Sequence, residues 1–203
     1  VMLLGQTVNS YSSSREGRDV SFGELLRLVD QTPGLKRLRF MSPHPFFVNE
    51  RMVRAMAETP QVCRHLHLPA QSGSDPVLKA MLRNYTRAEL LAKTADLRRR
   101  MPDLELSSDF IVGFPGETEE DFALTLTLAA EMGLAAAYCF KYSPREGTPA
   151  FEAEDSVPEP VKEERLARLL DKVATLTQSA LRSWQGRTVS VLLESADTGR
   201  TAH

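Results

Sequence analysis

Short apolar runs alternate with amphipathic stretches along this chain, and the alternation predicts strands followed by helices. The clearest apolar run is residues 110–114, at the end of the predicted strand 104–114; it is nearly unbroken and therefore fits a strand buried on both faces of a parallel sheet. It stops at Pro115-Gly116, and Thr118 with Asp121 then forms a capping-box pattern that opens a helix. The predicted strands are residues 1–4, 35–41, 62–68, 104–114 and 135–142, and another begins at 189–193.

Helix-starting residues precede each amphipathic stretch. Helices are predicted to be capped by Ser21, Asn49, Asp75, Thr86 and Thr118, and a long one runs from Pro158 to about Trp184. In the long helix we expect the inward residues to be Val161, Leu166, Leu169, Leu170, Val173 and Leu176. Residues 7–19 are rich in Ser, Asn, Gly and charge, and we expect a loop there. A strand–helix order repeated four times predicts an α/β fold of βαβ units.

A polar or glycine-rich cluster follows each of the first five predicted strands. Any α/β protein needs polar or glycine-rich turns between its strands and helices. If the five strands are parallel, however, the five clusters meet at one rim, which is where α/β folds bind ligands. The rim residues with polar or reactive side chains are Gln6, Asn9, His44, Gln71, Ser72, Asp109, Glu117, Tyr142 and Arg145. This set suits a polar small molecule that carries amine, carboxylate and ribose groups, without defining a reaction.

Composition narrows the class of protein. The 203 residues are 42% hydrophobic and 26% charged, which is typical of a globular domain that buries a core. The net charge of −2 gives no overall attraction to nucleic acid. Cys63 and Cys139 lack metal-site spacing and are expected to be buried hydrophobes in a reducing compartment. His65 and His67 could ligate a metal, although structural roles are favoured.

Three consecutive arginines, residues 98–100, end a predicted helix. They could contact RNA phosphates, but interaction with the carboxyl end of the helix is favoured.

Several longer motifs, in order, resemble one enzyme family. They are LLGQTVNSY (3–11), RLRFMSPHP (37–45), HLHLPAQSGSDPVLKAM (65–81), DFIVGFPGETEEDF (109–122) and YSPREGTPA (142–150). The chain resembles the tRNA methylthiotransferases of the radical S-adenosylmethionine superfamily. It is most similar to the MiaB-like branch, which adds a methylthio group to C2 of N6-isopentenyladenosine next to the anticodon.

The resemblance implies a partial (β/α)6 radical SAM barrel over residues 1–185, without its first strand. It also implies that residues 186–203 begin a TRAM RNA-binding domain. The residues that match the S-adenosylmethionine contacts of the family are Gly5, Gln6, Asn9, Gln71, Ser72, Asp109, Gly113, Phe114, Gly116 and Tyr142. In particular, the glycines of residues 112–116 are expected to let the adenine approach the backbone. Substrate contacts are implied for Ser42, His44, Ser143 and Arg145.

The chain departs from the family pattern in its cysteines. The family's CxxxCxxC loop, and three further cysteines, would hold two 4Fe–4S clusters, and neither Cys63 nor Cys139 matches them. The chain starts inside an apolar run and ends just after another, so we expect it to be a fragment of a longer enzyme. We expect this fragment to be inactive alone, and the cluster cysteines to lie upstream of Val1. We therefore expect no metal ligand and no catalytic residue within residues 1–203.

Other expectations follow from the resemblance. The partners would be the tRNA anticodon stem-loop and an electron-donor protein, with no membrane, and the complete protein would be a cytoplasmic monomer. Two sister enzymes modify a ribosomal protein or threonylcarbamoyladenosine, and their QD…YG and GxHLGxY segments differ from LLGQTVNSY. A non-catalytic cofactor- or RNA-binding remnant is the alternative that is not an enzyme.

Overall fold

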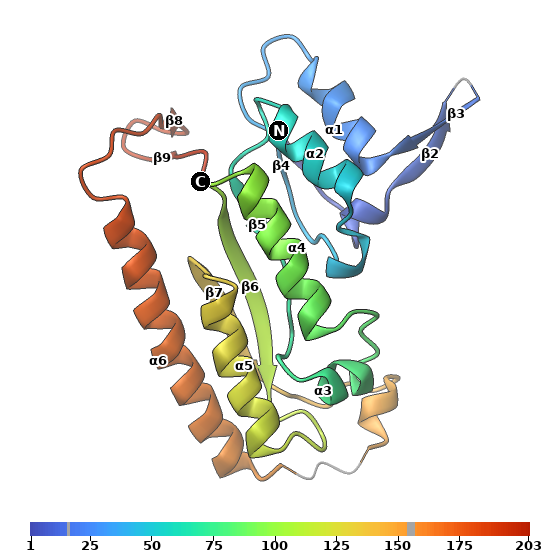
Figure 1. Cartoon of the computed structure of the whole chain (residues 1–203), viewed down its shortest axis with the longest axis vertical. Coiled ribbons are helices and arrows are strands. Elements are labelled where there is room, and N and C mark those ends of the chain that lie inside the picture. Colours follow the sequence, from blue (N-terminus) through green and yellow to red (C-terminus); the bar gives the residue numbers. More distant parts are fainter. Residues whose placement is uncertain (16, 154–156) are drawn as a thin grey trace. The chain divides into compact units, whose positions relative to one another are not determined.

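The computed structural model describes residues 1–15, 17–153 and 157–203, which fall into two compact units. The first unit comprises Val1–Leu68, Lys93–Glu105 and Gln185–His203. The second comprises Pro69–Ala92 and Leu106–Trp184. Figure 1 shows the elements of both, and each unit is described separately below.

The first unit contains short strands and two helices. Strands β1 (Met2–Leu3) and β4 (Arg39–Phe40) pair in parallel, and Leu38 and Val62 form a further parallel bridge. The other elements are β5 (His65–His67), α1 (Phe22–Asp30), α2 (Glu50–Glu58), the 3-10 turns Val8–Ser10 and Pro45–Phe47, and the hairpin of β8 (Leu192–Leu193) and β9 (Gly199–Arg200). The predicted strands at these positions exist but are shorter, because only two or three residues of each pair with a neighbour.

The expectation of a loop over residues 7–19 is wrong. Within it, β2 (Ser12–Arg15) and β3 (Arg18–Ser21) form an antiparallel hairpin in which Ser12 pairs with Ser21 and Ser13 with Val20. The hairpin is mostly polar, so backbone hydrogen bonds hold it and no alternation of apolar residues marks it in the sequence.

The second unit has a parallel strand pair with helices packed against it. Strands β6 (Glu105–Val112) and β7 (Ala136–Lys141) pair from Ser107–Ala136 to Val112–Lys141, and Gln71 bridges to Phe110 in parallel. Phe110 and Phe122 are among its fully buried side chains. Helices α5 (Glu119–Glu131) and α6 (Glu159–Ser183) contact one another, and α6 contacts β7 (Figure 1). The remaining helices are α3 (Asp75–Ala80), the 3-10 turn Pro149–Phe151, and α4 (Arg87–Arg100), which continues into the first unit.

Local capping signals explain where the helices start. Ser21 and Glu24 form a capping box before α1, and Thr118 and Asp121 form one before α5, as predicted. Asn49 caps α2 through the N–H of Met52. For α3 the prediction needs a correction, because Ser74 is the capping residue and Asp75 is the first residue of the helix.

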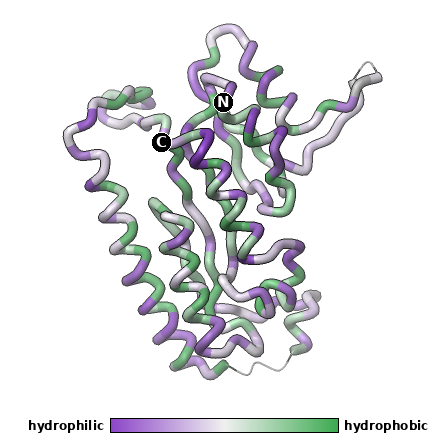
Figure 2. Tube along the Cα trace, viewed as in Figure 1, coloured by the Kyte–Doolittle hydropathy of each residue, from purple (hydrophilic) through white to green (hydrophobic). Residues whose placement is uncertain are grey.

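Helix α6 buries a different face from the one predicted. Leu169 and Val173 are buried as expected, but Leu170 is 48% exposed, whereas Lys162 and Arg165 are buried. Figure 2 shows hydrophobic and hydrophilic residues alternating along this helix. The prediction failed because hydropathy places Lys and Arg outside, while here both have specific partners on another segment.

The arginines at the end of α4 are held by nearby carboxylates. Arg100 contacts Asp96 one turn earlier at 3.2 Å and Glu50 at 3.5 Å, and Arg99 also contacts Asp96. Ion pairs with carboxylates of the same unit thus account for Arg99 and Arg100, whereas the predicted interaction with the helix end stays a prediction.

No helix among the described residues combines the length and the hydropathy that a membrane crossing requires.

Candidate functional site

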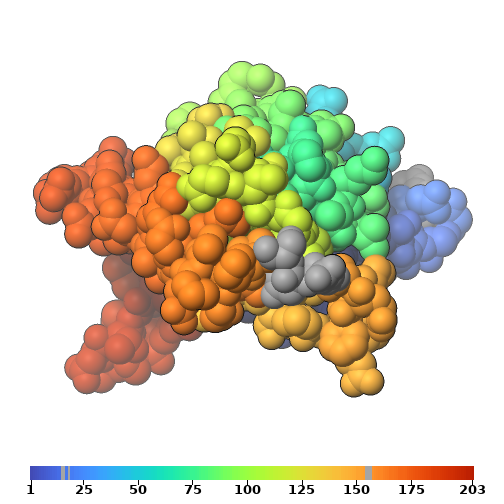
Figure 3. Space-filling model, turned by 90° about the horizontal axis from the view of Figure 1, so that it is seen from below, coloured from blue at the N-terminus to red at the C-terminus, as the bar shows by residue number. Residues whose placement is uncertain are grey.

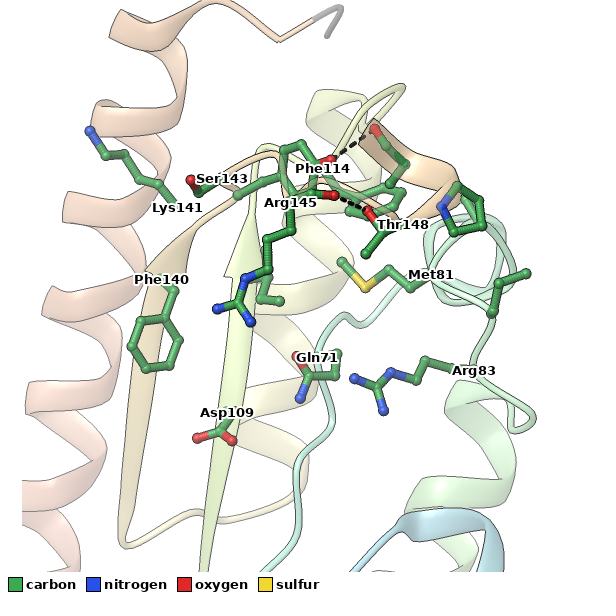
Figure 4. Close-up of a pocket in the computed structure, with 16 residues that line it drawn as sticks. Gln71, Met81, Arg83, Asp109, Phe114, Phe140, Lys141, Ser143, Arg145 and Thr148 are labelled. Carbon is green, nitrogen blue, oxygen red and sulfur yellow. Dashed lines mark hydrogen bonds between the residues drawn. The ribbon is translucent and has the colours of Figure 1, made fainter. Parts of the chain in front are cut away.

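A cavity of about 680 Å³ lies within the second unit, at the ends of β6 and β7 (Figure 4). Its volume is in the range of small-molecule sites. The loop of residues 143–150 borders it, and in Figure 3 this loop lies near the N-terminal turns of α5 and α6, as expected at the carboxyl ends of parallel strands. Residues that follow α3 complete the lining.

Gln71 supplies a side-chain amide to this cavity. Its residue is only 7% exposed, and its backbone bridges β6, with the N–H donating to the Asp109 carbonyl at 2.8 Å and the carbonyl accepting from Ile111 at 2.9 Å. Its side-chain amide, which lies in the cavity in Figure 4, makes no hydrogen bond with the described residues. Its amide oxygen and nitrogen are therefore accessible from the cavity and can hydrogen-bond a ligand there.

Strained backbone marks the strand ends. Thr7, Ser42 and Gln71 follow β1, β4 and β5 and have φ angles of 53°, 57° and 68°, in the left-handed region that non-glycine residues avoid. The other such residue in the described ranges, Leu82 at 57°, lines the cavity. Strain of this kind costs about 1–3 kcal/mol per residue and concentrates at functional sites.

The turn after β6 is held by a buried ion pair. The Gly113 N–H and Arg165 Nη1 both donate to Glu117 Oε1, at 2.9 and 2.8 Å, and the side chains of Arg165 and Glu117 are 6% and 0% exposed. Burial raises the pKa of Glu117, and the bonds from Gly113 and Arg165 partly offset that rise. The second oxygen, Oε2, is buried and has no hydrogen-bond partner among the described residues.

Gly113 itself is required by packing. It has φ +72°, and a Cβ there would lie 2.4 Å from Cγ of Lys162, so the Lys162 stem fills the space where a side chain would be. The expectation that this glycine makes room for an adenine therefore finds no support in the geometry. At Gly116, φ is +80° and nothing lies near the missing Cβ, so the turn conformation accounts for the glycine.

Two aromatic residues in contact, Phe114 and Tyr142, form part of the cavity wall. The rings of Phe114 and Tyr142 meet edge to face with centroids 5.0 Å apart, and Lys162 Nζ lies 5.8 Å from the Tyr142 ring centroid. The Tyr142 hydroxyl donates to the Ala150 carbonyl at 2.9 Å, which fastens the loop of residues 143–150 to the strand end.

The second unit brings several predicted site residues together. Those that line the cavity are Gln71, Asp109, Phe114, Tyr142, Ser143 and Arg145. Ser72 does not join them. It is fully buried, and its hydroxyl lies 3.3 Å from that of Thr125 on α5. The structure thus gives Ser72 a packing role, and its contact with a cofactor stays a prediction without geometric support.

The predicted residues of the first unit form a separate group. Asn9 donates to the His44 carbonyl at 3.0 Å and accepts from the His44 N–H at 2.8 Å, so its amide clamps two loops together. His44 Nδ1 accepts from the Phe46 N–H at 3.2 Å. Gly5, Gln6 and Ser42 are exposed. A smaller hollow of about 270 Å³ in this unit, between the β2–β3 hairpin and α1, contains none of these residues.

Some cavity residues were not predicted from the sequence. Arg83 and Leu82 follow α3, and Phe140 and Lys141 end β7. The alternation of β7 could have placed Phe140 on the face of Tyr142. Arg83 follows a helix and not a strand, so the pattern of strand ends gave no signal for it.

The chain matches the sequence profile of the radical SAM superfamily over residues 5–129, more than half of its length, and it belongs to that superfamily. Among curated proteins it is similar to tRNA-2-methylthio-N(6)-dimethylallyladenosine synthases. The synthase from Thermus thermophilus is 49% identical, and the match covers 95% of this chain and 41% of the relative. The synthase from Sorangium cellulosum is 48% identical, and the match covers 98% of this chain and 43% of the relative. The chain therefore spans about two fifths of the length of these relatives.

A solved structure supports the fold. Escherichia coli coproporphyrinogen III oxidase (HemN), a radical SAM enzyme, matches with a TM-score of 0.50 and 16% identity, over 88% of this chain and 52% of that one. The α/β fold predicted from strand–helix alternation is thus confirmed at the level of the radical SAM fold.

The described residues do not fit an iron–sulfur cluster. Cys63 is buried in the first unit and Cys139 lies on β7 of the second, where burial raises the pKa of its thiol to about 11. A cluster needs several thiolates together. Within the described ranges, no three His, Cys, Asp or Glu side chains are placed to bind a metal ion, His65 and His67 included.

Proposed function

We propose that this chain is the cofactor-binding part of a tRNA methylthiotransferase. Its reaction would add a methylthio group to C2 of N6-isopentenyladenosine, the dimethylallyl nucleoside of the relatives' name, next to the anticodon. The observation that carries the proposal is the 49% identity to a synthase of that name over 95% of the chain. Because tRNA would be the substrate, we expect the protein to act in the cytoplasm.

In this proposal, S-adenosylmethionine occupies the cavity of the second unit. The cofactor carries an ammonium, a sulfonium, a carboxylate and a ribose, and the cavity offers a carboxylate (Asp109) that matches the ammonium and an amide (Gln71) that can hydrogen-bond the polar groups. The rings of Phe114 and Tyr142 give its adenine an apolar wall. Bound S-adenosylmethionine supplies the radical chemistry from which the superfamily takes its name.

The residues of the chain would position and shield this cofactor. The Glu117–Arg165 pair holds the glycine turn, and the Tyr142–Ala150 hydrogen bond holds the loop at the mouth. The proposal includes two 4Fe–4S clusters, whose ligands must be residues other than Cys63 and Cys139. It also includes a partial barrel over residues 1–185, the start of a TRAM domain at 186–203, an electron-donor protein and a monomeric state.

Cofactor binding can be measured directly by calorimetric titration of the chain with S-adenosylmethionine. Gln71→Ala should weaken binding about tenfold, since it removes one or two hydrogen bonds from a buried site. Gln178→Ala, on the exposed side of α6, is the matched control and should leave affinity unchanged. Equal affinities of Gln71→Ala and the unsubstituted chain would exclude this cavity as the cofactor site.

The reaction requires a test in the source organism. Mass spectrometry of tRNA nucleosides after deletion of the gene should show loss of the methylthio group from isopentenyladenosine, restored by the intact gene. Unchanged tRNA nucleosides, with a missing methylthio group on a ribosomal protein or on threonylcarbamoyladenosine, would favour a sister enzyme. No change in any of these would favour the non-catalytic alternative.

A further inference from the structure

The β6–β7 sheet presents two aromatic rings beside the cavity. Tyr138 and Phe140 are two residues apart on β7, so their side chains point to the same face of the sheet. They are 64% and 53% exposed, whereas the alternate residues Ala137 and Cys139 are less exposed. Phe140 lines the cavity, and Tyr138 extends the same face beyond the cavity lining.

Charged groups around this face are unevenly distributed. Arg145 and Arg83 enter the cavity from two different segments, the loop after β7 and the residues after α3 (Figure 4). Asp109 lies opposite Tyr138 in the register of the sheet. A phosphate group is attracted by the guanidinium groups and repelled by this carboxylate. A nucleotide would therefore place its phosphates toward the arginines and its base toward the rings.

We propose that Tyr138 and Phe140 form a stacking surface for one unpaired base of the RNA substrate, with Arg83 and Arg145 holding the adjoining phosphates. This inference rests on the proposed function, in which the substrate is a tRNA loop. Single-stranded RNA is recognised by stacking unpaired bases on aromatic side chains, often on the face of a sheet, and every base offers a ring face for this contact.

Other occupants fit this face less well. A protein partner needs a far larger apolar area than two rings provide. The adenine of S-adenosylmethionine could contact Phe140, but a ligand confined to the cavity would leave Tyr138 uncovered, because Tyr138 is outside its lining. Substitution of Tyr138 should therefore affect RNA binding and leave cofactor binding unchanged.

The test uses the protein as its natural gene encodes it and an anticodon stem-loop with 2-aminopurine in place of the base that follows the anticodon. Stacking on an aromatic ring quenches 2-aminopurine fluorescence. Tyr138→Ala should weaken binding about tenfold and reduce the quenching, in line with the value of one base–aromatic contact. Tyr138→Phe, which keeps the ring, should restore both, and Leu181→Ala, an equally exposed apolar residue on α6, should change neither.

Salt dependence separates the two kinds of contact. Tyr138→Ala should leave the slope of log K against log salt unchanged, whereas Arg145→Ala should reduce it by about 1. Because Tyr138 is exposed, Tyr138→Ala should also keep the melting temperature and the S-adenosylmethionine affinity. Phe140→Leu, which keeps an apolar side chain of similar size, is a second variant and should lose quenching as well.

The outcomes distinguish this inference from the proposed function. If Tyr138→Ala and Phe140→Leu bind and quench like the unsubstituted protein while tRNA is still methylthiolated, the stacking surface is wrong and the function stands. If the unsubstituted protein prefers the stem-loop no more than an RNA duplex of equal length, both are wrong. An equal loss of S-adenosylmethionine affinity in Tyr138→Ala would assign these rings to the cofactor.

Discussion

The two units use the same sequence feature, an amide in the loop after a strand, in opposite ways. In the first unit the Asn9 amide hydrogen-bonds the N–H and the carbonyl of His44, and its Nδ2 also contacts Met52 Sδ. In the second unit, both the N–H and the carbonyl of Gln71 are hydrogen-bonded to the backbone of β6, and the side chain lines the cavity. The Asn9 amide thus clamps a loop, whereas the Gln71 amide, whose own backbone is paired with β6, is left to bind a ligand.

The largest expected effect tests how the second unit holds its cavity. Arg165→Ala leaves the Glu117 carboxylate buried without its cation, and the free energy of unfolding should fall by about 3–5 kcal/mol. Urea unfolding of the chain measures this. Arg168→Ala, one turn away and 42% exposed, is the control and should cost about 1 kcal/mol or less. Equal losses for the two variants would contradict the assignment of Arg165 as the anchor.

A second prediction asks whether the glycine turn is built for packing or for a ligand. Gly113→Ala forces a left-handed alanine against Lys162, and we expect about 2–3 kcal/mol of destabilisation. Shortening the neighbour in Gly113→Ala/Lys162→Ala should recover part of that loss in the same unfolding assay. If Gly113→Ala instead keeps its stability and loses S-adenosylmethionine affinity, close approach of the cofactor is the reason for the glycine.

A third prediction concerns the first unit. Asn9→Ala removes the two hydrogen bonds between the Asn9 side chain and the backbone of His44, as well as the contact with Met52 Sδ, so the free energy of unfolding should fall by about 1–3 kcal/mol. Calorimetry of the folded variant should give an unchanged S-adenosylmethionine affinity. A loss of affinity without a loss of stability would return Asn9 to the cofactor site and remove the contrast with Gln71.

The smallest effect is a pH dependence in the first unit. Burial lowers the pKa of His65, helped by Arg39 and His67. Below about pH 6.5 the unfolded chain therefore binds a proton that the folded chain resists, and stability should fall as the pH drops through that value. His65→Gln should flatten this part of the stability–pH curve, and His67→Gln, which removes only the last of the three causes of the lowered pKa of His65, should flatten it less. A steeper curve for His65→Gln would contradict the sign.

Local signals predicted the helices and several cavity residues correctly. The capping boxes at Ser21 and Thr118 depend on residues three positions apart, so the sequence alone can reveal them. Gln71, Asp109 and Tyr142 could be grouped because parallel strands bring their carboxyl ends to one edge.

The features that the sequence did not reveal depend on distant partners. Arg165 is buried because Glu117, 48 residues earlier, neutralises it, and hydropathy alone places an arginine outside. Lys162 is buried because Gly113 leaves room for its stem. Ser72 was predicted to belong to the site because it follows a strand and matches the family's motif, but the Ser72 hydroxyl contacts Thr125 on α5.

The left-handed residues at the strand ends have a consequence for protein engineering. Glycine is the residue that the backbone prefers at Thr7, Ser42 and Gln71, so a screen for heat resistance should enrich glycine at all three positions, each gain being about 1 kcal/mol. Only at Gln71 would that substitution also delete a side chain that faces the cavity. Selection for stability and selection for ligand binding in this cavity should therefore conflict at Gln71, whereas Thr7 and Ser42 lie outside the cavity lining.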